Sequence, residues 1–308
     1  MARPLRYVPP GSLIEVTITT IHRRFLLRPS RDLLEITHGL VARAARLYPV
    51  EVVDFVFLSN HAHLLLIPRD SQALSDFMEY LDGNLAKEAG RLHDWHEKFW
   101  GRRYHSIPVT DEEEAQVARL RYLLEHGCKE DLVRSPLDWP GARGTRALLD
   151  GRPVTGVWIS RTAERHARKR GEAFGKYDYA EEESLELAPL PCWAHLSPEE
   201  YRRRVRELVR EIEREARAKH AESGRAPLGR RRILRLDPHG KPQSSKRSPA
   251  PRCHAATHAA RQSFRYAYAE FDAAFHQAAD DLRTGSRTPE FPPGSFPPAL
   301  PYVRGRSP

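Results

Sequence analysis

Two kinds of hydrophobic pattern follow one another along the first 110 residues. A period of two, or a short unbroken apolar run, is typical of a strand, and a period near 3.6 is typical of a helix. Ser30 stands where a side chain can cap a helix, and Pro49 stands where that helix must end. The patterns predict strands over residues 12–20, 50–58, 62–67 and 104–109, and helices over residues 30–47 and 72–91.

The order of these six elements predicts a fold class. Strand, helix, strand, strand, helix, strand is a βαββαβ arrangement. We therefore expect an α+β, ferredoxin-like domain with one antiparallel sheet and its helices on one face. The first and third strands form the central pair of such a sheet. A third helix should follow, with Thr110 and Glu113 as a capping box and Gly127 closing it.

The second half of the chain predicts a mainly helical C-terminal extension. Residues 158–170 form a basic helical stretch, Ser197 caps a long helix to about residue 221, and residues 254–282 are also helical in pattern. Between them, residues 225–247 hold eight Lys or Arg and one Asp among Gly, Pro and Ser, typical of either a solvated linker or a DNA-backbone arm. We expect a catalytic domain over 1–148, a helical accessory region over 149–224, a basic linker over 225–252, and a helix with a Pro-rich tail over 253–308.

The composition of the chain indicates which class of partner it binds. The chain carries 50 Lys and Arg against 41 Asp and Glu, with a pI near 9.6, which favours a polyanion such as nucleic acid. Three distant cysteines indicate neither a disulfide framework nor a zinc cluster. No apolar run reaches the length of a membrane span, and the first residues lack an apolar signal core, so we expect a cytoplasmic protein.

His61-Ala62-His63 lies where an apolar strand begins after a turn. Alternate residues of a strand point the same way, so both imidazoles lie on one face and can hold one metal ion. Two ordinary histidines, each bonded to backbone, would give the same pattern. The pair alone does not decide between these interpretations.

The third predicted helix carries a second group of candidates. Tyr122 lies one turn from His126 and about one turn from Arg119, opposite the apolar stripe of Val117 and Leu120. A phenol needs nearby positive charge to act as a nucleophile, and a guanidinium can contact phosphate. The ordinary alternative is a tyrosine whose ring rests on a neighbouring surface.

Four motifs follow one another within residues 10–145. They are Asn60-His61-Ala62-His63-Leu64-Leu65, Phe99-Trp100-Gly101-Arg102-Arg103-Tyr104, Tyr122-Leu123-Leu124-Glu125-His126, and Asp131-Leu132-Val133 with Asp138-Trp139-Pro140. In this order and approximate spacing they resemble the single-tyrosine HUH transposases, above all the REP-associated, IS200-like tyrosine transposases. This chain has His126 where the family usually has Asn, or Gln in relatives, and Ser59 where it usually has Pro.

The resemblance implies a chemistry and a partner. A divalent metal, Mg²⁺ or Mn²⁺, would polarise a DNA phosphate, and the tyrosine would attack it to form a 5′-phosphotyrosine link. The partner would be single-stranded DNA with hairpin elements, handled at the nucleoid by a monomer or a homodimer. The residues implied are Tyr122 as nucleophile, His61, His63 and His126 as metal ligands, and Arg102, Arg103 and Arg119 as phosphate contacts.

Three other functions fit parts of the pattern. A decayed or domesticated relative would bind DNA hairpins without cleaving them. A metal hydrolase with His-x-His needs an Asp-His pair directly afterwards, where this chain has Leu64-Leu65-Leu66. An RNA-binding module with the same sheet needs exposed aromatic residues on its central strands, where the third strand offers histidines.

Overall fold

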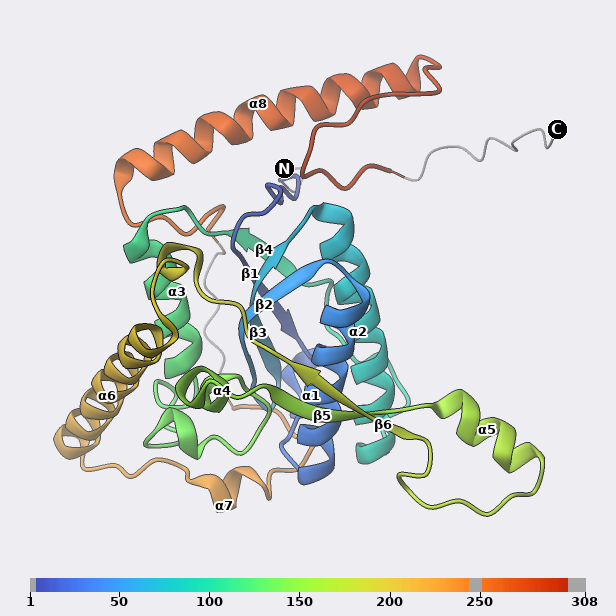
Figure 1. Ribbon diagram of the computed structural model, residues 1–308, viewed down its shortest axis with the longest axis vertical. Coiled ribbons are helices and arrows are strands. Elements are labelled where there is room, and N and C mark those ends of the chain that lie inside the picture. The colour runs from blue at the N-terminus through green and yellow to red at the C-terminus, as the bar shows by residue number, and fades with distance from the viewer. Residues whose placement is uncertain (1–3, 244–250, 299–308) are drawn as a thin grey trace.

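The computed structural model describes residues 4–243 and 251–298. Its centre is a four-stranded antiparallel sheet in the order β2-β3-β1-β4 (Figure 1). The strands are β1 (Ile14–Thr19), β2 (Val50–Phe57), β3 (His61–Pro68) and β4 (His105–Pro108). The predicted βαββαβ arrangement is confirmed, and β1 and β3 are the central pair.

Two helices pack on one face of this sheet, α1 (Arg31–Leu47) and α2 (Ser71–His93). The Ser30 side chain accepts from the Leu33 amide, as its position in the sequence predicts. Asp70 caps α2 in the same way. Even-numbered residues of β1 and β3, such as Val16 and Leu64, point into this apolar layer.

The other face of the sheet is also covered, by α3 (Glu113–Glu125), α4 (Thr145–Asp150) and α6 (Pro198–Ser223). Ser197 caps α6 in a full capping box with Glu200. The buried residues of α6 pack against α3 and α4, so this helix braces the second face of the sheet. Odd-numbered residues of β3, which include both histidines, therefore lie between the sheet and α3.

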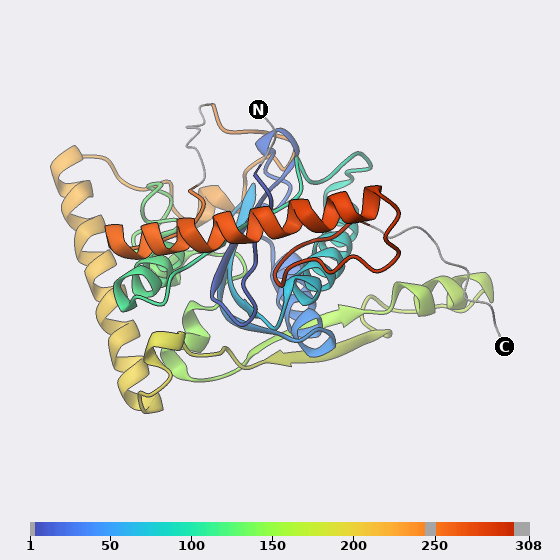
Figure 2. The ribbon, with the colours of Figure 1, turned by 90° about the horizontal axis from the view of Figure 1, so that it is seen from above.

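The extension differs from the prediction in a hairpin of two strands, where only helices were expected. Residues 154–185 form a hairpin of β5 (Val154–Ile159) and β6 (Ala180–Leu185) around α5 (Arg161–Lys169), which extends away from the rest of the molecule (Figures 1 and 2). The acidic run of Glu181, Glu182 and Glu183 lies within β6. Glu183 is buried there because Arg43 and Arg46 of α1 pair with it, at 2.6 and 2.7 Å.

The capping box predicted at Thr110 is wrong. Helix α3 begins at Glu113, and its N-cap residue Glu112 makes no side-chain cap. The Thr110 hydroxyl instead contacts Glu112, and its amide donates to the carbonyl of His254. The backbone at His254 thus accepts the hydrogen bond that the Thr110 amide would donate to Glu113 in a capping box.

The final elements are α7 (Arg230–Ile233) and α8 (His258–Arg283), with α8 lying across the molecule near the N-terminus (Figure 2). Tyr7 stacks on Phe271 of α8 at 4.3 Å between ring centroids, so aromatic residues of α8 pack against the N-terminal segment. The predicted Pro-rich tail lies partly outside the described residues. Short 3-10 turns occupy Ile21–Arg23, Pro136–Asp138 and Pro191–Trp193. No described helix combines the length and the apolar character that crossing a membrane requires.

Candidate metal and tyrosine site

The two histidines of β3 and one at the end of α3 meet on the second face of the sheet. Ring centroids are 5.3 Å apart for His61 and His63, and 4.4 Å apart for His63 and His126. One ligand atom from each of the three lies within 4.8 Å of the others. Within the described residues, this is the cluster of His, Cys, Asp or Glu whose spacing suits a metal ion.

Each of the three rings uses its Nδ1 atom for another contact. His126 Nδ1 lies 2.6 Å from the carbonyl of Tyr122, His63 Nδ1 lies 2.9 Å from Glu15, and His61 Nδ1 lies 2.6 Å from the amide oxygen of Asn60. All three partners are acceptors, so they favour the tautomer with the proton on Nδ1. The Nε2 lone pairs are then available to a cation.

The electrostatics favour neutral rings. Burial, together with the charge of the nearby His63 ring, lowers the pKa of His126 to about 3. Burial and the two neighbouring imidazoles also hold the pKa of His61 well below its usual range. A neutral imidazole is the form that binds metals, so these rings are ready to ligate at neutral pH.

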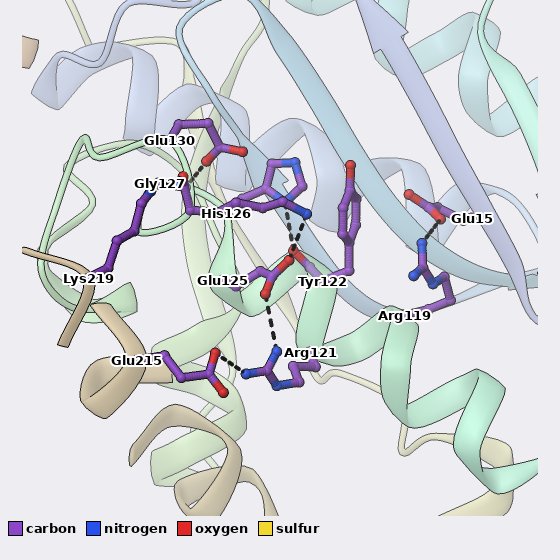
Figure 3. A network of polar contacts seen from close by, with 11 residues as sticks. Glu15, Arg119, Arg121, Tyr122, Glu125, His126, Gly127, Glu130, Glu215 and Lys219 are labelled. Carbon is purple, nitrogen blue, oxygen red and sulfur yellow. Dashed lines mark hydrogen bonds and ion pairs between the residues drawn. The ribbon is translucent and has the colours of Figure 1, made fainter. Parts of the chain in front are cut away.

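Tyr122 stands on α3 beside His126, with ring centroids 4.4 Å apart (Figure 3). Two cations lie over its ring, the Arg119 guanidinium at 4.8 Å and the Lys129 ammonium at 4.7 Å. Burial, together with the charges of Glu15 and Glu130, raises the pKa of Tyr122 to about 12. The group is therefore a phenol at neutral pH.

Glu15 is a site residue that sequence reasoning missed. Its side chain is buried on β1 and contacts His63, with Arg119 3.4 Å and His254 2.7 Å from its other oxygen. Burial alone would raise the pKa of this carboxyl, but the contacts with His254 and His63 lower it, so it is ionised. The alternation of β1 could have indicated this residue. Odd-numbered residues of β1 and β3 lie on the same face of the sheet, so Glu15 is on the face that carries His63.

The remaining predicted residues separate into two groups. Arg119 lies in the site, between Glu15 and Tyr122. Arg102 and Arg103 are exposed in the segment before β4. This segment reaches the same end of the sheet as His61, because Gly101 donates to Thr19 and Thr19 pairs with His61. The structure does not place Arg102 or Arg103 in contact with the histidines or the tyrosine.

The structure thus combines a βαββαβ domain with three clustered histidines and an adjacent tyrosine. Comparison with known families finds one whose sequences match this part of the chain. Residues 12–123 match the family described as "Transposase IS200 like". The predicted resemblance is thus confirmed for the segment that carries His61, His63 and Tyr122, which is similar to a family of DNA-processing enzymes. His126 lies three residues beyond the matched segment.

Two solved structures are similar to this chain. One is a REP-associated tyrosine transposase bound to a REP hairpin, at 17% identity and a TM-score of 0.41, with 49% of this chain and 86% of that chain covered. The other is a protein from Deinococcus radiodurans, provisionally described as a transposase, at 20% identity and a TM-score of 0.28, with 39% and 95% covered. Comparison with curated proteins gave no match.

Proposed function

We propose that this protein cleaves and rejoins single-stranded DNA at hairpin-flanked sites through a covalent tyrosine link. The observation that carries the proposal is the approach of Tyr122 to the three histidines, since it brings together a nucleophile and a candidate cation site. The family match for residues 12–123 supports the DNA-processing class. Residues 1–148 are proposed as the catalytic domain, with the regions that follow as its extensions.

His61, His63 and His126 are the residues that would hold a divalent ion. Their fit rests on the donor set: three imidazoles whose Nδ1 atoms are already engaged, which leaves their Nε2 atoms for a cation. A bound Mg²⁺ or Mn²⁺ would supply positive charge to polarise the scissile phosphate. Imidazole in all three positions favours Mn²⁺ over Mg²⁺, because Mg²⁺ prefers oxygen ligands.

Tyr122 would carry the covalent step. Its hydroxyl oxygen forms a bond to phosphorus, the bond between phosphorus and the 3′ oxygen breaks, and the 5′ side of the DNA break stays on the protein as a phosphotyrosine. The phenol loses one proton and the 3′ oxygen gains one, so the step consumes no water and no external energy source. Arg119 and Lys129, which already flank the ring, lower the cost of negative charge on the phenol.

The first prediction is that Tyr122→Phe abolishes a covalent adduct with DNA. Protein is incubated with Mn²⁺ and 3′-labelled single-stranded oligonucleotides that cover inverted repeats flanking the gene, and the label is followed on a denaturing gel. Removal of the hydroxyl leaves no nucleophile, so the shifted band should disappear, and a chelator should remove it from the wild type. Tyr266→Phe, at an exposed tyrosine of α8, is the matched control and should leave the band intact.

Persistence of the adduct in Tyr122→Phe would refute the assignment of the nucleophile. A wild-type protein that binds the hairpin oligonucleotides and forms no adduct would instead identify a DNA-binding relative without cleavage. The raised pKa of Tyr122 and the histidine at position 126 are the features that favour this second candidate function.

A further inference from the structure

The basic segment after α6 is fastened to the protein on both sides of the candidate site. We call residues 225–243 the arginine strap, which runs from the end of α6 through α7 in Figure 1. At its start, the amides of Leu228 and Gly229 donate to the carbonyls of Asp131 and Leu132, both at 2.8 Å. Ile233 is fully buried in the core beneath α3 and α6. The strap is therefore a docked part of the fold.

The far end of the strap is fastened to the loop between β1 and α1. The Phe25 amide donates to the carbonyl of Gly240 at 2.9 Å, and Arg28 donates to the carbonyl of Leu234 at 3.0 Å. This loop also borders the histidines, because the Leu27 amide donates to the carbonyl of Ser59. The other anchor, Leu132, donates to Gly127, the neighbour of His126. The middle of the strap thus crosses between the two segments that flank His61 and His126.

The arginines of the strap stay free of acidic partners. Some arginines of the neighbouring helices pair with acids, as where Arg121 of α3 meets Glu215 and where Arg204 of α6 meets Glu113. Others on α6, such as Arg203 and Arg210, also lack an ion pair with any described residue. The strap holds six Lys or Arg and one Asp. Its four central arginines are all exposed, and none forms an ion pair with a residue in the ranges 4–243 and 251–298; they are Arg230, Arg231, Arg232 and Arg235.

We propose that the arginine strap binds the phosphate backbone of the single DNA strand that leads to Tyr122. The proposal rests on the function proposed above, and it assigns the DNA contact to a region outside the domain that the family match covers. A strand whose phosphate reaches the histidines must pass one of the segments that border them. The positive charge of each guanidinium attracts the phosphate oxygens of a DNA backbone.

The surface of the strap favours a polyanion over a protein partner. Protein interfaces are centred on buried apolar and aromatic residues. The large hydrophobic residues exposed in the described structure are Leu47, Tyr177 and Tyr266, and none of them belongs to the strap. Unpaired arginines on a fixed backbone are instead the arrangement that releases counterions when it meets DNA.

The test compares two variants of equal charge in the full-length protein. The strap variant is R230Q/R231Q/R232Q, and the control is R203Q/R210Q/R214Q on exposed positions of α6. Both carry Tyr122→Phe so that no cleavage intervenes. Binding of fluorescein-labelled (dT)30 is measured by anisotropy at several salt concentrations. A third variant, R230K/R231K/R232K, keeps the charge and reports on damage to the fold.

We expect the strap variant to bind (dT)30 more than about 10-fold more weakly at low salt. The slope of log affinity against log salt should fall by about 2, since each phosphate contact on a single strand contributes about 0.7. The control and the Lys variant should stay within about 2-fold of the parent. Equal losses in the strap variant and the control, no loss in either, or a similar loss in the Lys variant would overturn the proposal.

The adduct assay keeps this outcome separate from that of the proposed function. If wild-type protein forms no adduct while the strap variant still loses (dT)30 binding, the chemistry assigned to Tyr122 is wrong and the strap assignment stands. If the adduct forms and the strap variant binds (dT)30 as the parent does, the strap assignment alone is wrong.

Discussion

At the scale of single residues, the buried carboxylate of Glu15 determines which nitrogen His63 presents to the site. It accepts from Nδ1 and so favours Nε2 as the ligand atom. The Thr17 hydroxyl lies 3.1 Å from the same Nδ1. His63 is thereby held from the strand next to its own, which limits the freedom that its ring would lose on binding a cation.

Glu15→Ala should weaken Mn²⁺ binding by about 10- to 100-fold, the usual effect of removing a group that orients a ligand. Glu15→Gln should fall between Ala and the wild type, because its amide oxygen can still accept from Nδ1. Affinity is measured by isothermal titration calorimetry at fixed pH. Glu114→Ala removes one exposed acid of α3 as the control. A Glu15→Ala protein that folds and binds Mn²⁺ as tightly as Glu114→Ala would show that this contact does not serve the site.

The residues themselves were predictable to different degrees. Strand alternation and helix spacing were enough to bring His61, His63, Tyr122 and Arg119 to one place, because each lies on a regular element. Lys129 and His254 were not predictable, because a loop places the first and a segment distant in sequence places the second. The roles of all of them remain predictions.

At the scale of elements, α1 and β5 approach each other at a pair of glycines. A Cβ on Gly39 would lie 2.2 Å from the carbonyl oxygen of Val157, and one on Gly156 would lie equally close to the Gly39 amide. The backbone of α1 contacts the backbone of β5 directly at this point. An added methyl group would therefore meet backbone atoms, which cannot move aside as a flexible side chain can. This contact fixes the hairpin, and α5 with it, against the first helix.

Gly39→Ala should therefore destabilise the protein, by about 1–3 kcal/mol as overpacked sites usually do. Gly83→Ala is the matched control within α2, where nothing lies within 4 Å of the added methyl group. That control should be neutral or stabilising by up to about 1 kcal/mol, since alanine favours a helix over glycine. Both are measured by urea unfolding. Equal stability of the two variants would contradict the close approach.

Hydrophobic periodicity predicted the elements that are stabilised by burial of apolar side chains. It did not predict a strand that is stabilised by a buried ion pair. The sheet and its first two helices follow their hydrophobic patterns closely. β6 was not predicted, because one of its two buried positions is a glutamate that depends on Arg43 and Arg46 of α1. An ion pair between residues about 140 positions apart leaves no periodic signal in either segment.

At the scale of the whole molecule, buried histidines make the folded state sensitive to acid. Burial lowers the pKa of His38 to about 4, and burial together with the charge of Arg28 lowers the pKa of His93 to about 4. The unfolded chain takes up these protons near pH 6.5. The stabilising contribution is therefore complete above about pH 6.5 and is lost as the pH falls towards 4.

His38→Gln should flatten this dependence. The unfolding free energy of the wild type should rise between pH 4 and 6.5, and the variant should lose up to about 1.4 kcal/mol per pH unit from that slope, the value for one proton. Chemical unfolding is followed at several pH values with chelator present. The exposed His276 stays in water in both states, so His276→Gln is the control. An identical slope in His38→Gln would place the acid sensitivity elsewhere.

The contact between Glu15 and His254 also orders events in time. Glu15 leaves the ribosome well before His254, which joins the end of β4 through its backbone. The nascent chain can form the sheet and bring three histidines together while this carboxylate still lacks one of its partners. The finished arrangement therefore arises only after His254 has been made, later than the sheet and the three histidines, and a protein that cuts DNA would gain its full competence only then.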